Sequence, residues 1–283
     1  MEEPKRIQYS SDNPVLNNPY LEPKFHYDTD VDGNVDYSTI INGRRPYGYD
    51  ISIVPQKAKL VKALFTQEDF SSTNPNSDFI NGIRKEVKTW RTAGYPKASR
   101  ITKELLDFWF SNSQRLPQQR LFFCQQEAVE TAVWLNEIAD KDANMGNFYL
   151  RELQDRRHTV SNDDDDILPR TAFKMATGTG KTVVMAMLIL YHYLNKKANP
   201  MDTRYADHFL VCAPGITIRD RLGVLHLDNS QRSNNYDRSD YYHQRGLIPM
   251  QFEKELGGLN SCITIINYQQ FLRRTFSGKH ASP

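Results

Sequence analysis

The sequence has few cysteines, no long apolar run and almost no net charge, and each absence narrows the class of protein. Its three cysteines, Cys124, Cys212 and Cys262, are odd in number and far apart, which argues against a disulfide framework. No apolar stretch approaches the roughly 18–20 residues that a helix needs to span a bilayer. The N-terminal MEEPKRIQYS is polar and lacks the apolar core of a signal peptide. A cytoplasmic protein without a membrane partner is therefore expected.

The near-zero net charge of +2 does not indicate a nucleic-acid binder, although a sum over the chain can hide a local basic face. With 283 residues, of which 39% are hydrophobic and 25% charged, the composition is that of a folded globular protein. This length allows two domains, or one domain with a large extension.

The first 60 residues are rich in Pro, Asn, Asp, Gly and Tyr, and they predict an irregular region that favours β-structure. Pro14, Pro19 and Pro23 exclude a helix at NPVLNNPYLEP. The segment FHYDTDVDGNVDYSTIING predicts two strands joined by a turn at Asp32-Gly33-Asn34, and YDISIVP predicts another short strand.

From residue 57 the apolar spacing becomes helical. NGIRKEVKTWRTAG and SRITKELLDFWF each predict a helix, the second capped by Ser99. A polar stretch from Gly146 to Arg170, with the acidic run Asp163 to Asp166, predicts an insertion or loop. Between the second of these helices and the polar stretch, CQQEAVETAVWLNEIADK predicts an amphipathic helix. Its core-facing residues are Ala128, Val129, Ala132, Val133 and Leu135.

The last third of the chain alternates between strand and helix patterns. RTAFKM, DHFLVCAP and SCITIINY predict buried strands. KTVVMAMLILYHYLNKK, ITIRDRLGVL and FEKELGGL predict helices, and SQRSNNYDRSDYYHQRG is a polar excursion between them. Such alternation predicts an α/β fold with a parallel sheet covered on both faces.

A candidate phosphate-binding loop, KMATGTGKT, lies between the first of these strands and the first helix. Gly178 and Gly180 allow the backbone to approach phosphates, Lys181 can reach the β- and γ-phosphates, and the Thr182 hydroxyl can bind Mg²⁺. Met175 stands where the common pattern has its first glycine. The alternative is a strand-to-helix turn that carries a lysine by chance.

MATGTGKT, with Met in first place, resembles the first motif of superfamily 2 helicases of the restriction type, a branch that includes the motor subunits of type III restriction enzymes. FFCQQEAVETAVWL is similar to the glutamine motif of that branch, with Gln125 in the adenine-reading place. FLVCAPGITIRDRL resembles motif Ia, and ITIINYQQFLRR resembles a later strand and turn on the DNA side. NPYLEPKFHY and INGRRPYGY resemble the N-terminal extension of one restriction-endonuclease group.

The resemblance implies a RecA-like P-loop domain at residues 116–283, preceded by an irregular α+β accessory region at 1–115. It implies ATP and Mg²⁺ as cofactors, ATP hydrolysis, and movement along double-stranded DNA, with modification or nuclease subunits as candidate partners. Lys181 and Thr182 take catalytic places, and Thr182 takes the metal place. The implied ATP-binding residues are Gln125, Thr177, Gly178, Thr179, Gly180, Lys181 and Thr182. The implied DNA-contacting residues are Pro214, Gly215, Arg219, Asn267 and Tyr268.

One family motif is missing. Hydrolysis in this family requires Asp-Glu-x-His (DExH) on a later strand, and the sequence contains no such motif. The run Asp163 to Asp166 precedes the loop without an apolar strand, so it is not a substitute. A second RecA-like domain with its arginine finger is also absent. The expectation is an N-terminal piece of a longer motor, truncated before the DExH motif, which binds nucleotide and hydrolyses almost none.

Several other patterns favour structural roles. Asp28 to Thr39 resembles an EF-hand loop, but Thr39 stands where a bidentate Glu is needed, so a polar β-turn is expected. Asp78 with Glu86-Val87-Lys88 could suggest a nuclease centre, but the helical period there predicts an exposed charged face. His192 is expected to be a packing residue.

For one arginine-rich segment a solvated loop and a DNA contact stay open, because nearby aspartates offset its charge. Its cations and aromatics are Arg219, Arg221, Arg232, Arg238, Arg245, Tyr236, Tyr241 and Tyr242.

Two further functions stay open. One is a different P-loop NTPase, although the guanine-reading Asn-Lys-x-Asp is not met, since Asn195-Lys196-Lys197 is followed by Ala198. The other is a non-catalytic piece that binds nucleotide, DNA or partner subunits.

Overall fold

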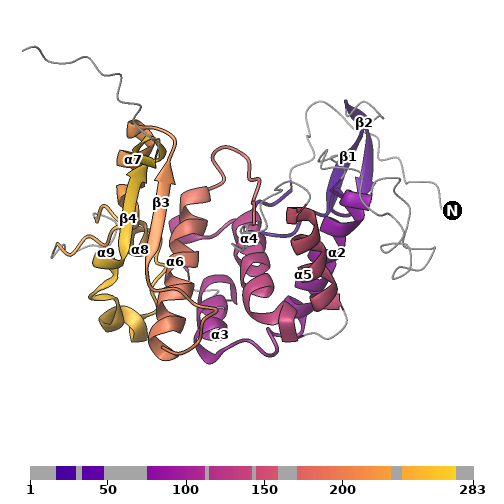
Figure 1. Cartoon of the computed structure of the whole chain (residues 1–283). Coiled ribbons are helices and arrows are strands. Elements are labelled where there is room, and N and C mark those ends of the chain that lie inside the picture. The colour runs from indigo at the N-terminus through magenta and orange to yellow at the C-terminus, as the bar shows by residue number, and fades with distance from the viewer. Residues whose placement is uncertain are drawn as a thin grey trace, which may run out of the picture. The chain divides into compact units, whose positions relative to one another are not determined.

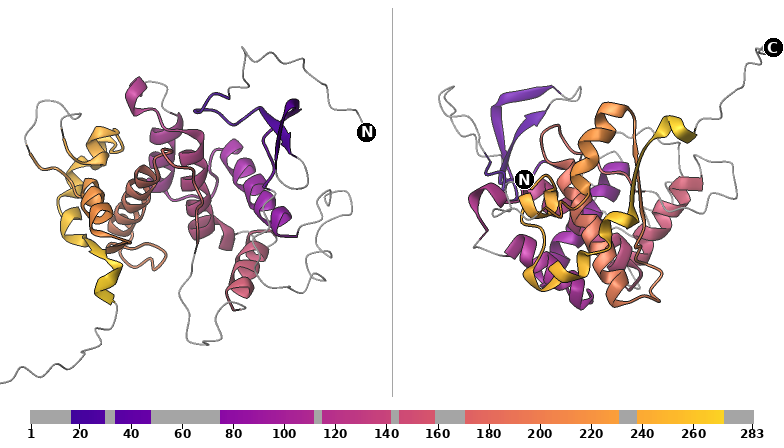
Figure 2. Two further views of the ribbon diagram at one scale, coloured as in Figure 1. Left: turned by 90° about the horizontal axis from the view of Figure 1, so that it is seen from above. Right: turned by 90° about the vertical axis from the view of Figure 1, so that its left-hand side faces the viewer.

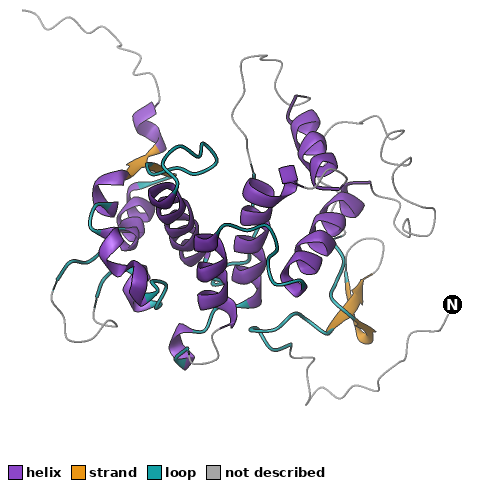
Figure 3. Ribbon diagram, turned by 90° about the horizontal axis from the view of Figure 1, so that it is seen from below, coloured by secondary structure: helices purple, strands orange, loops and turns teal. Residues whose placement is uncertain are grey.

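The computed structural model describes residues 17–29, 34–47, 75–111, 115–141, 145–158, 171–230 and 238–271. The chain forms two compact units, Met1–Leu106 with Arg120–Lys181, and Asp107–Gln119 with Thr182–Pro283. Helices make up most of the described residues and strands are few (Figure 3). The division into an accessory region at 1–115 and a RecA-like domain at 116–283 stays a prediction.

The N-terminal hairpin is present in the first unit. Strand β1 (Phe25–Thr29) pairs antiparallel with β2 (Val35–Asn42), with Phe25 opposite Asn42 (Figure 1). This confirms the two predicted strands, while residues 30–33 of the predicted turn and the candidate strand YDISIVP lie outside the described residues. The segment that resembles an EF-hand loop is thus flanked by strands, in place of the two helices of that motif.

Helix α2 (Pro75–Thr92) confirms the helix predicted from NGIRKEVKTWRTAG. Its buried stripe, Phe79, Ile83, Val87 and Trp90, follows the helical period. The helix ends at Thr92, and Gly94 just beyond it has a left-handed φ of 74°. The Gly94 and Tyr95 amides donate to the carbonyls of Arg91 and Trp90, at 3.0 and 3.1 Å, in the pattern of a Schellman motif. Glu86 and Lys88 lie on this helix, which does not offer the strands of a nuclease centre.

Helix α3 (Arg100–Leu106) begins at Ser99, as predicted, because the Ser99 hydroxyl accepts the Thr102 amide at 3.0 Å. The helical path continues as a π turn at Asp107–Ser111.

The predicted amphipathic helix appears as α4 (Phe123–Val133), followed by a π turn (Trp134–Ile138) and a 3₁₀ turn (Ala139–Lys141). Ala128, Val129 and Val133 are buried, as predicted. The assignment of Ala132 and Leu135 to the core is wrong, because both are only half-buried. The π turn changes the rotation per residue, so that Trp134 is buried in place of Leu135.

Two carboxylates of this helical segment are completely buried. Glu130 binds Arg91 and accepts the Tyr95 hydroxyl and the Gln126 amide at 2.7 and 2.8 Å. Burial opposes the charge of Arg91, but the hydrogen bond and charge of Glu130 raise the pKa of Arg91 above its usual value.

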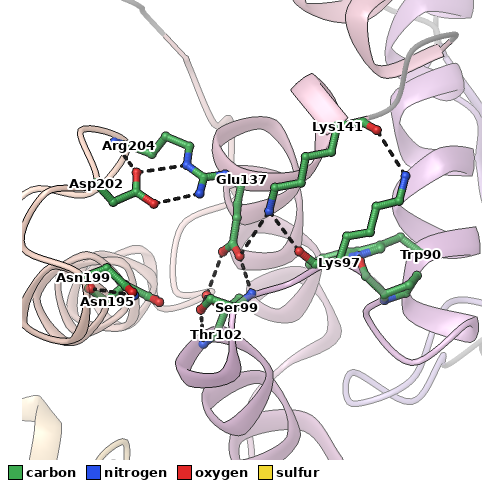
Figure 4. A network of polar contacts seen from close by, with 11 residues as sticks. Trp90, Lys97, Ser99, Thr102, Glu137, Lys141, Asn195, Asn199, Asp202 and Arg204 are labelled. Atoms are coloured by element: carbon green, nitrogen blue, oxygen red, sulfur yellow. Dashed lines mark hydrogen bonds and ion pairs between the residues drawn. The ribbon is translucent and has the colours of Figure 1, made fainter.

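The second buried carboxylate, Glu137, is held at the start of α3 (Figure 4). It accepts the Ser99 amide, and the Thr102 hydroxyl donates to it at 2.8 Å. The Lys141 ammonium lies 3.9 Å from the same carboxylate. Both carboxylates are therefore fully engaged, which removes most of the cost of burying them.

Helix α5 (Met145–His158) corrects one expectation, since a loop was predicted from Gly146 onward. Its residues include good helix formers, and Tyr149 supplies an apolar anchor that the polar composition concealed. Tyr149 is 1% exposed, with its ring 5.6 Å from that of Phe79 and 6.2 Å from that of Trp134. Helices α2, α4 and α5 consequently lie side by side (Figures 1 and 2). Residues 159–170, with the acidic run, lie outside the described residues.

The second unit contains the predicted parallel strands. β3 (Phe209–Ala213) pairs in parallel with β4 (Ile263–Asn267), and the long helix α6 (Lys181–Ala198) precedes them. The short elements are α7 (Ile216–Arg221), α8 (Tyr241–Gln244), a 3₁₀ helix (Met250–Leu256) and α9 (Leu259–Cys262). The expectation of a sheet covered on both faces is wrong in part, because Leu210 and Cys212 are exposed on one side of β3.

The strand expected at RTAFKM is also wrong. Residues 171–176 have no regular structure and are mostly exposed. A strand requires a hydrogen-bonded neighbour, and an apolar run cannot supply one by itself.

No described helix combines the length and apolar character needed to cross a membrane.

Residues 107–119 are tied into the second unit by two polar side chains. The Arg115 guanidinium donates to the carbonyls of Gln119, Arg245 and Gly246, at 2.9, 2.7 and 3.0 Å. The Trp109 indole donates to the Leu247 carbonyl at 2.8 Å. These bonds attach Trp109 and Arg115 to the second unit.

The polar excursion before α8 contains a buried centre. The Asp240 carboxylate accepts the backbone and ring N–H of His243, both at 2.8 Å, and the Asp228 amide at 2.9 Å. Burial works against ionisation of Asp240, but these hydrogen bonds hold its pKa below the usual range. This part of the excursion is therefore ordered by its own polar groups.

His192 lies between aromatic residues of the second unit, in agreement with the predicted packing role. Its ring centroid is 4.8 Å from that of Tyr191 and 6.4 Å from that of Tyr205. Burial lowers the pKa of His192 to about 4.

A pH dependence of stability follows, because the unfolded chain binds a proton at His192 near its ordinary pKa of about 6.5 and the folded chain does not. As the pH falls from 6.5 to about 4, this site should lower the free energy of unfolding by at most about 1.4 kcal/mol per pH unit. His192→Phe should remove that part of the slope in urea denaturation at several pH values. His208→Phe, which changes an exposed histidine, serves as the control. Equal slopes in wild type and His192→Phe would contradict the prediction.

Gly82 is required by the contact between α2 and α5. A Cβ atom at Gly82 would lie 2.2 Å from the Tyr149 hydroxyl oxygen. Overpacking of this kind costs about 1–3 kcal/mol, against a gain of up to about 1 kcal/mol from alanine in a helix. We expect Gly82→Ala to lower the free energy of unfolding by up to about 2 kcal/mol in urea denaturation. The loss should shrink in a Tyr149→Phe background, and a fully additive double variant would rule out the clash.

Candidate functional site

The candidate nucleotide site consists of the first turn of α4 and the loop that precedes α6. Gln125, the third residue of α4, is 4% exposed, and its Oε1 accepts the Phe122 amide at 2.8 Å. This bond is half of a capping box, because the Phe122 side chain has no acceptor to complete it. The bond fixes the orientation of the Gln125 amide.

The other end of that amide reaches the loop. Gln125 Nε2 donates to the Thr179 carbonyl at 3.0 Å, across 54 positions of sequence. The neighbouring Cys124 thiol is half-buried, and burial raises its pKa, which the Thr179 hydroxyl partly offsets. The structure thus brings together the two segments that the sequence singled out for adenine and for phosphate.

The loop owes its shape to two glycines. Gly178 and Gly180 have φ of 81° and 80°, a left-handed conformation that glycine adopts without strain. A Cβ atom on Gly178 would meet nothing within 4 Å, so the backbone conformation, and not lack of space, requires glycine there. The Thr179 hydroxyl closes the turn by donating to the Ala176 carbonyl at 2.7 Å. Thr177 is exposed at the tip.

Lys181 folds back over this loop. Its ammonium donates to the carbonyls of Met175 and Ala176, at 2.9 and 2.8 Å, and the side chain is exposed. Carbonyls are neutral acceptors, so an anion at the same place would bind the ammonium more strongly. Met175, which stands in place of the usual first glycine, therefore contributes its backbone carbonyl as a hydrogen-bond acceptor for Lys181.

Helix α6 begins at Lys181, and Thr182 is its second residue, half-buried. The first amides of a helix have no partner within the helix and attract anions. Backbone donors, two left-handed glycines and one ammonium fit the needs of a triphosphate. For Mg²⁺ the fit rests on the Thr182 hydroxyl, since the described residues contain no cluster of three or more His, Cys, Asp and Glu side chains.

The candidate DNA residues gather at one edge of the β3–β4 pair. Ala213 is opposite Asn267 in the parallel register, so Pro214 and Gly215 leave the sheet beside Tyr268. Gly215 is the N-cap residue of α7 and its carbonyl accepts the Arg219 amide at 3.0 Å. Because β3 and β4 are parallel, their carboxyl ends lie at the same edge. The sequence could predict this juxtaposition only after both strands had been identified.

These candidates differ in exposure. Pro214 is exposed and Tyr268 is 46% exposed, whereas Asn267 is 5% exposed and accepts the Gln269 amide at 3.3 Å. Arg219 is paired with Asp220 at 2.8 Å. The two strand ends are brought together, and their role as DNA contacts stays a prediction.

The arginine-rich segment is only partly a solvated loop. Arg238 donates to the His243 ring nitrogen at 2.9 Å, and Tyr242 is fully buried. The Arg245 guanidinium lies 5.6 Å from the Tyr241 ring. Arg232 and Tyr236 lie outside the described residues.

Sequence reasoning missed the cationic side chains around the start of α4. Arg44 pairs with Glu127, and the guanidinium carbons of Arg44 and Arg91 lie 5.6 and 5.2 Å from the Phe123 ring centroid. The sequence indicated these cations only indirectly, because the glutamates at positions 127, 130 and 137 lie in a segment with a core-facing side and so require positively charged or hydrogen-bonding partners.

Residues 118–281, more than half of the chain, match the model of a protein family described as type III restriction enzyme, res subunit. The matched region includes α4, the phosphate loop and both strands of the parallel pair. No curated protein and no solved structure matches the chain.

Proposed function

The chain belongs to the type III restriction enzyme res subunit family, and we propose that it binds ATP as part of an ATP-dependent DNA motor. The family implies a RecA-like fold for the matched residues. The observation that carries ATP binding is the hydrogen bond from Gln125 to Thr179, because it joins the adenine-reading residue to a loop with two left-handed glycines.

Each residue of the site has a distinct role in the proposal. Amides of Thr177 to Thr182 would surround the phosphates, and the Lys181 ammonium would exchange its two carbonyl partners for phosphate oxygens. Gln125 would retain an unused amide hydrogen and an acceptor lone pair for the adenine edge. The Thr182 hydroxyl would be one ligand of Mg²⁺, which would supply positive charge against the phosphates.

For DNA we propose the edge formed by Pro214, Gly215 and Tyr268, with Arg219 available when it exchanges Asp220 for a phosphate. Backbone amides and a single arginine favour contacts to the phosphate backbone over contacts to base edges. Modification or nuclease subunits are proposed partners through the family, and the cytoplasm is the proposed location.

Hydrolysis is a separate matter. The sequence has no DExH motif, and the described residues contain no cluster of three or more His, Cys, Asp and Glu side chains that could hold a metal ion. We therefore propose that this chain binds nucleotide without turning it over.

Lys181→Ala should weaken ATP binding by about tenfold to a hundredfold. The variant loses a charge-assisted contact that contributes about 1.5–3 kcal/mol. Isothermal titration with ATP measures the affinity, and Lys103→Ala, which removes the same charge from an exposed position on α3, is the control. An unchanged dissociation constant for Lys181→Ala would mean that the loop does not hold the phosphates.

Duplex DNA should bind weakly, without sequence preference, and with strong salt dependence. Contacts to phosphates release counterions, so raising the salt from about 50 to 200 mM should weaken binding by at least tenfold when several phosphates are contacted. Fluorescence anisotropy with two duplexes of unrelated sequence tests this. Tight, sequence-selective binding with little response to salt would contradict the proposed edge.

ATP turnover should stay at background even where ATP binding is measurable. An arginine finger alone contributes about 10³–10⁵ in rate, and no acidic motif prepares the attacking water. Phosphate release is to be measured with and without duplex DNA, next to Lys181→Ala as the blank. DNA-stimulated turnover of about 1 s⁻¹, which lies in the ordinary range for enzymes, would show that another carboxylate replaces the missing motif.

A further inference from the structure

The N-terminal residues 17–29 and 34–47 contact the start of α4, first through its backbone. The first amide of that helix, on Phe123, has no partner within the helix and donates to the Pro19 carbonyl at 2.8 Å. The Tyr20 ring lies 5.5 Å from that of Phe122, and the Arg120 guanidinium lies 4.0 Å from the Tyr20 ring. The chain around residue 20 therefore holds the residues on which α4 begins.

A second contact holds the side of the same helix. The guanidinium of Arg44 binds both carboxylate oxygens of Glu127, and the two side chains are only 24% and 16% exposed. Arg44 also covers one part of the Phe123 ring, which is 8% exposed. A two-pronged pair fixes direction as well as distance, so Arg44 sets the position of the first two turns of α4.

Gln125 lies between the two residues that are held in this way. Any shift or rotation of the first turn moves its amide relative to the Thr179 carbonyl, 3.0 Å away. Thr179 stands between two left-handed glycines, and the Thr179 hydroxyl and the Lys181 ammonium both bond to carbonyls of the same loop. The bond from Gln125 adds a tie to a helix outside the loop, so the order of the loop depends in part on the placement of α4.

We propose that residues 17–29 and 34–47 act as a clamp on the first two turns of α4, and that Arg44 is a positioning residue for the candidate phosphate loop. The proposal rests on the proposed ATP binding for its functional consequence. Without Arg44, Glu127 keeps a half-buried charge without its partner, the first turn of α4 loosens, and Thr179 loses the bond from Gln125. The loop then spends less time in the arrangement that accepts phosphate, and apparent affinity falls by that fraction.

Arg44→Gln and Glu127→Gln remove the same pair from opposite sides. The use of both is necessary, because Arg84 is close to Arg44: burial, and then the charge of Arg44, lower the pKa of Arg84. Arg84 could bind Glu127 in the first variant but has no carboxylate to bind in the second. The matched control is Lys88→Gln, which breaks the 3.0 Å pair between Lys88 on α2 and Glu22 and leaves the pair between Arg44 and Glu127 in place.

Hydrogen exchange of the full chain tests the clamp without nucleotide. Amides of residues 176–181 should exchange faster in Arg44→Gln and Glu127→Gln than in wild type, and at the wild-type rate in Lys88→Gln. Arg44→Lys, which keeps one of the two contacts, should lie between, and it replaces Arg44→Gln if that variant does not fold. Unchanged exchange of the loop in both pair variants would overturn the clamp.

ATP titration then tests the consequence. Couplings of this kind change affinity by roughly two- to thirtyfold, and we expect a loss in that range for Arg44→Gln and Glu127→Gln. In a Gln125→Ala background the same substitutions should produce no further loss, since their path to the loop is already cut. Equal losses in both backgrounds would overturn the role of Gln125 as the link. Failure of wild type to bind ATP would instead refute the proposed function, while the hydrogen-exchange result would still decide whether the clamp exists.

Discussion

Two carboxylates with no exposure to solvent determine how the first unit is assembled. Glu130 and Glu137 lie on one continuous helical segment, and an ionised carboxylate in such a place is tolerable only when every partner is in position. Glu130 accepts hydrogen bonds from Arg91 in the last turn of α2 and from Tyr95 in the chain that follows it. Glu137 accepts hydrogen bonds from the Ser99 amide and the Thr102 hydroxyl at the start of α3. The ends of two helices are thereby attached to α4, which makes it the reference element of the unit.

The same helix also supports the candidate site at its opposite end. Its first turn carries Gln125, and Gln125 holds the loop through the Thr179 carbonyl. The candidate phosphate loop contains two left-handed glycines, and attachment to a rigid neighbour helps to keep its conformation. Buried pairs at Glu127, Glu130 and Glu137 provide that rigidity along the length of the helical segment. Stability and the proposed ligand binding therefore share one element, and substitutions there need readouts that separate the two.

Much of the fold could be predicted from local pattern. Helices α2, α4 and α6, the hairpin β1–β2 and the strands β3 and β4 all have periods or runs that their residues display directly. The phosphate loop and Gln125 could be identified in the same way, because glycine conformations and a lysine at a helix start are local requirements. Errors arose where a local pattern needed a distant partner. RTAFKM is apolar enough for a strand, but the described part of the structure places no partner strand beside it. The segment of α5 has a polar composition typical of a loop, and its buried residue Tyr149 packs against Phe79 and Trp134, which are distant in sequence.

By itself, the sequence determined most of the elements, the family and the identity of the residues around the loop, because backbone period, glycine and charge act within a few residues of each other. Only the tertiary structure decided that Gln125 faces Thr179, that Arg44 meets Glu127, and that the ends of β3 and β4 share an edge. The pair Arg44–Glu127 joins positions 83 residues apart. No periodicity encodes such a contact, since a buried charge selects its partner by position in space and by the desolvation that both must share.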